Sequence, residues 1–300
     1  MKNRVAITGM GIISSIGLTV EENFQSLLSK KHGISTIDFI DTVHKKEILV
    51  GEIKTSNETL QHLLNLPENN TFTRTGLLGA YAAKQAIQNA NILDVNEVRT
   101  GFISSTSVAG MDFTEKHYKQ YEQHPEYTKY IESHNAGDTS NKIAEYLGIK
   151  GFVTTISTAC SSAANAIMLG ATMIENGYLD RVIVGGTDAL SKFTINGFKT
   201  LMILSDTYNT PFDQNRKGLN LGEAAAYLVL ESDEMIHKYQ KKVLAYVAGY
   251  GNANDAYHQT ASSENGEGAY LAMKQAFEKA SILPDGIDYV NVHGTATPNN

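Results

Sequence analysis

The only cysteine of the chain, Cys160, lies in a setting that could make it a nucleophile. The apolar, β-branched run Phe152–Ile156 precedes it, and small residues followed by a helical pattern, Ser162–Asn176, come after it. This order predicts a cysteine at the tip of a strand-to-helix turn. The free N–H groups and the dipole of a helix N-terminus favour the thiolate, which is the nucleophilic form. Because a lone cysteine is often a buried, inert core residue, both interpretations stay open for Cys160 alone.

A second candidate is His293, which directly follows the apolar run Tyr289–Val292. The run predicts a strand, after which Gly294 turns the chain. A histidine at a strand end can hydrogen-bond a substrate carbonyl, although such a histidine alone is more often structural. Thr295 and Thr297 offer two hydroxyls to an amide-containing ligand.

Two other sequence patterns do not indicate a binding site. Gly9-Met10-Gly11 follows a strand, but Ser14 stands where a dinucleotide-binding fingerprint needs its third glycine. We therefore interpret it as a tight turn from strand to helix. The nine histidines show no metal-ligand spacing, so neither a metal nor another cofactor is expected.

Strand-like and helix-like segments alternate along the chain, and this predicts an α/β protein with buried sheets. The segment Met111–Ser133 is polar and lacks a clean period, so we expect a surface excursion or a subunit contact. The expected strands are Val5–Thr8, Gly101–Ser104, Phe152–Ile156 and Val182–Val184, and the expected helices are Thr75–Ala90, Thr139–Tyr146 and Ser162–Asn176.

The chain also repeats itself, since Ala82–Leu93 resembles Ala272–Leu283 at a constant offset of 190. A matching strand-like piece precedes each copy, Val5–Gly11 and Leu244–Gly251. The match predicts a duplicated fold, with a chance likeness of Ala-rich helices as the alternative. The first copy continues to the Cys160 turn, whereas the second stops soon after its strand. We therefore expect an incomplete second half with uncovered apolar surface.

Composition narrows the class of protein. With 300 residues, 42% of them hydrophobic and 19% charged, the chain is typical of a soluble globular protein. One cysteine excludes an intramolecular disulfide and fits a reducing, cytoplasmic location. No segment approaches the length of a membrane span, and Met1–Gly9 indicates a strand rather than a signal peptide. The formal charge of −7, without a dense basic block, argues against nucleic acid or an anionic membrane as partner.

Together, six ordered motifs resemble the β-ketoacyl-[acyl-carrier-protein] synthases of the elongating, type II fatty-acid and polyketide branch. The resemblance covers Val5 to Asn300. It implies a thiolase-like fold, in which two similar βαβαβαββ halves form a five-layered α/β core. The motifs are Thr158-Ala159-Cys160-Ser161-Ser162, Gly185-Gly186-Thr187-Asp188, Pro211-Phe212-Asp213, Leu221-Gly222-Glu223, Asp255-Ala256-Tyr257-His258 with Glu264-Asn265-Gly266, and Val292-His293-Gly294-Thr295-Ala296-Thr297-Pro298.

The resemblance implies a role for each candidate residue. Cys160 would accept an acyl chain from an acyl carrier protein, and its N–H would form half of an oxyanion hole. His293 would be the first of two catalytic histidines, which assist decarboxylation of malonyl-carrier protein. Thr295 and Thr297 would hydrogen-bond the phosphopantetheine arm. The product would be a 3-oxoacyl thioester two carbons longer. The implied partners are loaded acyl carrier proteins and a second copy in a homodimer.

The sequence also departs from the family pattern. It contains no Gly-His-x-x-Gly-Ala-Ala-Gly motif, which in the family carries the second histidine, nor the lysine before it. We therefore expect residues 1–240 to form the half with the nucleophile, residues 241–300 to begin a truncated second half, and the 300 residues alone not to complete the condensation.

Near Arg74, where synthases often display basic residues to the carrier, only that arginine is found, and this leaves room for a specialised secondary-metabolite synthase.

Two alternatives stay open. One is a non-catalytic chain-length partner in a ketosynthase heterodimer, although such partners usually lack the cysteine. The other is a different acyl-cysteine enzyme, such as a thiolase, although thiolases do not share this motif set.

Overall fold

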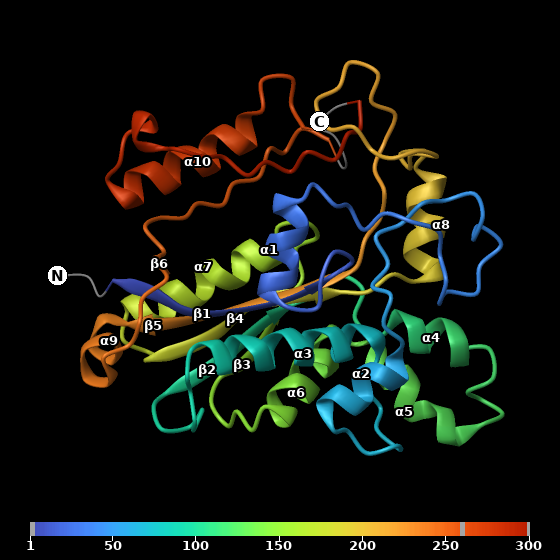
Figure 1. The fold of residues 1–300 in the computed structure, drawn as a ribbon, viewed down its shortest axis with the longest axis horizontal. Coiled ribbons are helices and arrows are strands. Elements are labelled where there is room, and N and C mark those ends of the chain that lie inside the picture. Colours follow the sequence, from blue (N-terminus) through green and yellow to red (C-terminus); the bar gives the residue numbers. More distant parts are fainter. Residues whose placement is uncertain (1–3, 259–261, 299–300) are drawn as a thin grey trace.

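The computed structural model describes residues 4–258 and 262–298. Within them, one mixed sheet has the strand order β3-β2-β4-β5-β1-β6 (Figure 1). β2 runs parallel to β3 and β4, whereas β5 is antiparallel to both β4 and β1. The strands are β1 (Val5–Ser14), β2 (Thr100–Ser105), β3 (Val153–Ile156), β4 (Arg181–Asp188), β5 (Ala224–Ser232) and β6 (Ala245–Tyr246).

Helices cover both faces of this sheet. α3 and α6 pack on one face and α7 on the other, and α10 lies beyond α7 (Figure 1). The helices are α1 (Val20–Leu28), α2 (Asn57–Leu64), α3 (Arg74–Asn89), α4 (Met111–His117), α5 (Thr128–Ile131), α6 (Ala136–Tyr146), α7 (Ser162–Glu175), α8 (Lys192–Thr200), α9 (Asp233–Tyr239) and α10 (Glu267–Ala280), with short 3₁₀ turns at Pro125–Tyr127, Glu132–His134 and Pro284–Gly286.

The core lies on both sides of the central strands. Every residue of β2 is buried, and successive side chains point to opposite faces of the sheet. Phe102 therefore joins the apolar cluster under α3, whereas Ile103 joins the cluster under α7. β4 divides in the same way, with Ile183 on the α3 side and Val184 on the α7 side. Both faces are covered, which explains why these strands appear in the sequence as continuous apolar runs.

The turn predicted at Gly9-Met10-Gly11 is wrong, because β1 continues through it to Ser14. The two glycines serve close packing instead. A Cβ at Gly9 would lie 2.4 Å from the main-chain oxygen of Ala86, and one at Gly11 would lie 2.1 Å from that of Ala82. α3 therefore rests directly on the backbone of β1.

The second copy of the repeat packs in the same way. A Cβ at Gly249 would lie 2.3 Å from the Ala276 oxygen, and one at Gly251 would lie 2.2 Å from the Ala272 oxygen. Ala276 and Ala272 on α10 are the counterparts, at the offset of 190, of the two alanines on α3. The glycine-on-alanine contact thus occurs twice, and the duplication predicted from the sequence is present in the packing.

The segment Met111–Ser133 is more regular than predicted. It contains α4, a 3₁₀ turn and α5, and aromatic rings join them: the His117 and Tyr130 rings stack with centroids 4.5 Å apart. No residue of α4 is buried, so the helix has no apolar face that would give a period in the sequence.

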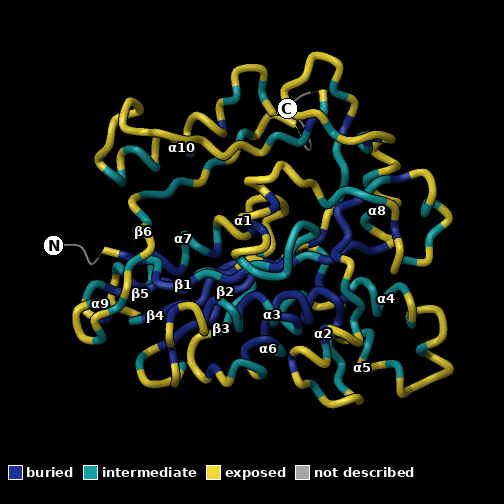
Figure 2. The backbone as a smooth tube through the Cα atoms, viewed as in Figure 1, coloured by how far each residue is buried: buried dark blue, intermediate teal, exposed yellow. Residues whose placement is uncertain are grey.

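The strand predicted at Tyr289–Val292 is not formed, because no described strand lies beside it to share a ladder. Its side chains are open to solvent, with Tyr289 79% and Val290 61% exposed. Figure 2 shows the contrast between the buried sheet with α3 and the mostly exposed chain around α10. The uncovered apolar surface expected for the second half is therefore present in the described residues.

Among the described residues, no helix is long and apolar enough to cross a membrane. In the same ranges, no three His, Cys, Asp or Glu side chains gather as they would around a metal ion.

Candidate active site

Cys160 lies on a sharp turn between β3 and α7, as the sequence predicts. β3 ends at Ile156, and α7 begins at Ser162 with Ser161 as its N-cap residue. Ala159, directly before the cysteine, has a φ of 52°, in the left-handed region that non-glycine residues seldom adopt. Cys160 itself is exposed. The turn therefore presents the thiol to solvent at the first turn of a helix, which excludes the buried, inert interpretation.

Hydroxyl groups hold this turn in shape. Ser162 Oγ donates to the Ala159 oxygen at 2.6 Å and accepts from the Thr158 N–H at 2.7 Å. Ser161 Oγ donates to the Thr158 oxygen at 2.8 Å, and Asn165 Nδ2 donates to Thr158 Oγ1 at 2.9 Å. Three of these bonds engage backbone groups of the turn, and the fourth joins two side chains across it. The run of small polar residues around the cysteine thus has a structural role in addition to giving access.

Small residues also seat α7 on the sheet. A Cβ at Gly170 of α7 would lie 2.5 Å from Val184 Cγ1, and one at Gly186 of β4 would lie 3.3 Å from Ala163 Cβ in the first turn of α7. The helix therefore approaches β4 closely, and its first turn, which directly follows the Cys160 turn, lies against the end of β4.

Asp188 organises the neighbouring loop. Its Oδ1 accepts hydrogen bonds from Thr106 Oγ1 at 2.7 Å, from the Ser107 N–H at 2.8 Å and from the Val108 N–H at 3.3 Å. Burial raises the pKa of this carboxyl above its usual range. Ser107 Oγ in turn donates to the Ala159 oxygen at 3.4 Å. Asp188 is therefore linked through one loop to the turn that bears Cys160.

The structure brings Thr295 and Thr297 together, with their hydroxyl oxygens 2.9 Å apart. Arg216 holds this turn, because its Nε donates to the Thr297 oxygen at 2.9 Å and its Nη2 to the Pro298 oxygen at 2.6 Å. Arg216 also donates to the main-chain oxygen of Asp213 at 3.1 Å. The loop after Pro211 is thus anchored by bonds from the Arg216 side chain to backbone carbonyls.

His293 is exposed and lies in extended chain rather than at the end of a strand, so that part of the prediction is wrong. Among the described residues, no hydrogen bond joins His293 to Cys160, which is exposed as well. Their pairing across the active site stays a prediction.

Asp255 contacts the loop before α10 and the first turn of that helix, whose N-cap residue is Gly266. The carboxylate accepts from the Ser263 N–H at 2.6 Å, from Ser263 Oγ at 2.7 Å and from the Gly268 N–H at 3.2 Å. The backbone and side-chain bonds from Ser263 lower the pKa of Asp255.

Arg74 is not displayed on the surface, which corrects its interpretation as a basic residue facing a carrier. It is 6% exposed, and its Nε and Nη2 donate to the Glu223 carboxylate. Glu223 also accepts from the N–H groups of Ile53 and Leu190, at 2.9 and 3.1 Å. The Leu-Gly-Glu motif therefore supplies a buried anion that joins α3 to two loops.

The family is decided by two matches that together span almost the whole chain. Residues 2–235 match "Beta-ketoacyl synthase, N-terminal domain", and residues 244–300 match "Beta-ketoacyl synthase, C-terminal domain". The chain belongs to the β-ketoacyl synthase family.

Relatives and solved structures agree with this assignment. The 3-oxoacyl-[acyl-carrier-protein] synthase 2 of Staphylococcus aureus (strain COL) is 33% identical over 98% of this chain and 73% of its own length. The ishigamide ketosynthase/chain length factor structure has a TM-score of 0.91 at 29% identity, covering 100% of this chain and 75% of that chain. A ketosynthase in complex with its chain length factor from Xenorhabdus doucetiae has a TM-score of 0.82 at 30% identity, covering 99% and 73%. The fold is therefore the thiolase-like ketosynthase fold.

Sequence reasoning did not identify several residues that shape this ketosynthase site. Ser107 and Asp188 act through contacts between loops more than 80 positions apart. The one signal in the sequence is Asp188 itself, the last residue of the Gly-Gly-Thr-Asp motif.

Proposed function

We propose that this chain is a condensing enzyme that acts as a 3-oxoacyl-[acyl-carrier-protein] synthase. In the first step the Cys160 thiolate attacks the thioester carbonyl of an acyl-carrier protein. An acyl–Cys160 thioester forms, and the carrier leaves as its free phosphopantetheine thiol. The exposed cysteine on its left-handed turn is the observation that carries this proposal.

The backbone at the turn also suits acyl transfer. Among the described residues, the Cys160 N–H donates no hydrogen bond, so it is available to a developing oxyanion on the acyl carbonyl. Thr295 and Thr297, held by Arg216, present two hydroxyls that would hydrogen-bond the amides of the phosphopantetheine arm.

The second step needs the complete active site. Malonyl-carrier protein loses carbon dioxide, and the resulting carbanion attacks acyl–Cys160, which gives a 3-oxoacyl thioester two carbons longer and frees the Cys160 thiol. We assign His293 to stabilising the enolate oxygen. We further propose residues 1–240 and 241–300 as the two halves, acyl carrier protein as the partner and a homodimer as the assembly.

Acyl transfer is tested by mass spectrometry. The 300-residue protein is incubated with a medium-chain acyl-carrier protein, and the peptide that contains Cys160 is expected to gain the acyl mass. Cys160→Ala abolishes the adduct, whereas the matched control Ser157→Ala, which changes an exposed residue of the same loop that makes no side-chain hydrogen bond among the described residues, retains it. A folded wild-type protein that gains no acyl mass would overturn the assignment of Cys160. Turnover of malonyl-carrier protein would instead contradict the expectation that the 300 residues alone do not complete the condensation.

A non-catalytic chain-length partner is the second candidate. It is favoured by the likeness to two solved structures in which a ketosynthase occurs with a chain length factor. The presence of Cys160 on a formed turn counts against it, and absence of the acyl adduct from folded protein would favour it.

A further inference from the structure

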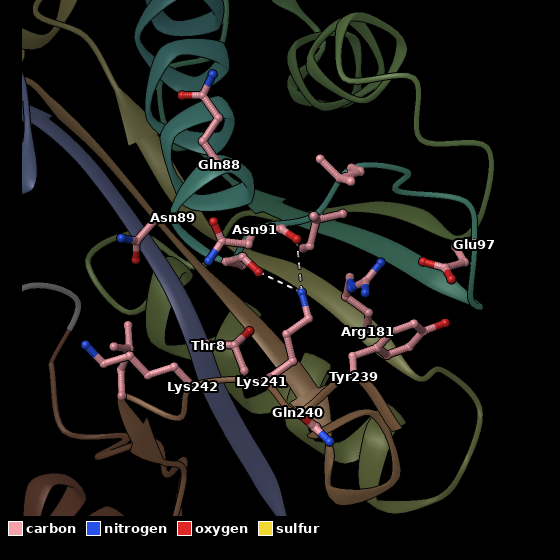
Figure 3. Close-up of a pocket in the computed structure, with 14 residues that line it drawn as sticks. Thr8, Gln88, Asn89, Asn91, Glu97, Arg181, Tyr239, Gln240, Lys241 and Lys242 are labelled. Carbon is pink, nitrogen blue, oxygen red and sulfur yellow. Dashed lines mark hydrogen bonds between the residues drawn. The ribbon is translucent and has the colours of Figure 1, made fainter. Parts of the chain in front are cut away.

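A cavity of about 790 Å³ lies at the edge of the sheet where β2 and β4 begin (Figure 3). Arg181, the first residue of β4, lies beside Thr100, the first residue of β2, whereas the Cys160 turn follows the far end of β3. β2 is six residues long, so at about 3.3 Å per residue the two edges are about 20 Å apart. The cavity is therefore remote from the nucleophile.

Arg181 is only partly satisfied, although it is 1% exposed. Its Nε donates to Glu231 Oε1 at 2.8 Å, and Glu231 Oε2 accepts from Thr8 Oγ1 at 2.7 Å. Nη1 of Arg181 is buried and has no hydrogen-bond partner within the described ranges. Buried polar groups are nearly always hydrogen-bonded, so an unpartnered guanidinium nitrogen beside a cavity indicates a ligand.

Lys241 supplies a second cation to the same cavity. Its Nζ donates to the main-chain oxygens of Ala90 at 2.7 Å and Asn91 at 3.3 Å, the two dashed lines in Figure 3. An ammonium has three donors, so one is left for another acceptor. Burial lowers the pKa of Lys241; the Glu231 and Glu97 carboxylates oppose this shift, and the Arg181 charge adds to it. An anion beside the two cations would offset the repulsion between them.

The rest of the lining is mixed, with the carboxylate of Glu97, several polar side chains and the apolar side chains of Ile92, Leu93 and Leu244. Gln88, Asn89, Asn91, Tyr239 and Gln240 supply the polar part of the lining of a space whose size is typical of small-molecule sites. Amides both donate and accept, so they suit a ligand with several polar groups.

We propose that this cavity binds a small polar metabolite that carries one oxyanion, either a carboxylate or a phosphate, held by Arg181 Nη1 and Lys241 Nζ. Guanidinium and ammonium groups form charge-assisted hydrogen bonds with both kinds of oxyanion. The ligand is separate from the acyl substrate, because the cavity and Cys160 lie at opposite edges of the sheet.

The test is calorimetric titration of the 300-residue protein with inorganic phosphate and, separately, with succinate, at an ionic strength held constant with chloride. Saturable binding is expected for at least one of them. Binding of phosphate alone identifies a phosphate group, and binding of succinate alone identifies a carboxylate. Binding of both shows an oxyanion site without discrimination. Failure of both to saturate would overturn the proposal.

Three variants locate the site. Lys241→Gln is expected to weaken the binding at least tenfold, whereas Lys242→Gln, which removes the same charge from the adjacent lining residue, changes it less than threefold. Arg181→Lys keeps the charge but removes Nη1, and it too weakens binding at least tenfold when its melting curve shows a folded protein. Equal losses in the Lys241 and Lys242 variants, or protection of Cys160 from iodoacetamide by the anion, would refute the assignment.

Discussion

Two substitutions of Asp188 distinguish the contribution of its hydrogen bonds to stability from that of its charge. All three of its described hydrogen bonds go to Oδ1, so Asp188→Asn keeps the acceptor while Asp188→Ala removes it. In the alanine variant the N–H of the exposed Ser107 can hydrogen-bond to water instead. Thr106 is 1% exposed, so its hydroxyl is left without its carboxylate acceptor. A hydrogen bond to a charged group contributes about 1.5–3 kcal/mol, so we expect Asp188→Ala to lower the free energy of unfolding by about 2–3 kcal/mol.

Asp188→Asn should behave differently, and its effect should depend on pH. Burial raises the pKa of Asp188, so the folded protein holds this proton more tightly than the unfolded chain does. The stability that this group contributes is complete below its unfolded pKa, near 3.9, and is lost as the pH rises through the raised folded pKa. Asparagine does not titrate. We therefore expect the stability of Asp188→Asn to lie within about 1 kcal/mol of wild type and to improve relative to it as the pH rises from about 4 to 8.

Urea denaturation followed by circular dichroism at several pH values measures all three proteins. The reasoning would be refuted if the asparagine and alanine variants lost the same stability. A pH-independent difference between Asp188→Asn and wild type would show that the buried charge carries no cost.

Three further predictions concern other parts of the fold. Glu223→Gln leaves the buried Arg74 without its counter-charge and should cost about 3–5 kcal/mol in urea denaturation; a loss below about 1 kcal/mol would contradict the buried pair. Ala159→Gly relieves the left-handed backbone and should add about 1 kcal/mol to stability in thermal melts, whereas a loss would show that the Ala159 methyl packs. Asp255→Asn should speed amide exchange in the first turn of α10 at neutral pH. Because the folded pKa of Asp255 is lowered, this difference from wild type should vanish as the pH falls through that value, and a difference that persists in acid would exclude the carboxylate as its cause.

The sequence predicts elements best where burial on both faces leaves a continuous apolar run, as in β2 and β4. It fails where one residue type serves two purposes: glycine suits both a turn and a close helix contact, and at Gly9 the contact with α3 prevails. A strand also needs a neighbour from elsewhere in the chain, which is why Tyr289–Val292 has strand composition without forming a strand.

In the candidate site, too, the sequence predicts some features and not others. Cys160 is predictable because a strand, a cysteine and a helix follow one another locally. The pairing of Arg74 with Glu223 joins residues 149 positions apart, so local pattern does not reveal it. The hydroxyl bonds around Thr158 depend on the turn's three-dimensional shape, which composition does not specify.

The hydrogen bonds from Arg216 to the main-chain oxygens of Thr297 and Pro298 also bear on the order of folding. The contact spans 81 positions, so it closes a long loop and gains its energy only after the sheet beneath it has formed. The chain beyond β6 otherwise meets α7 through few polar bonds, such as Tyr250 to Thr172 and Lys279 to Glu175. A segment joined late and by few contacts opens as one unit before the rest unfolds. Limited proteolysis should therefore cut first between β6 and α10 and leave the six-stranded sheet, through β6, as the resistant fragment.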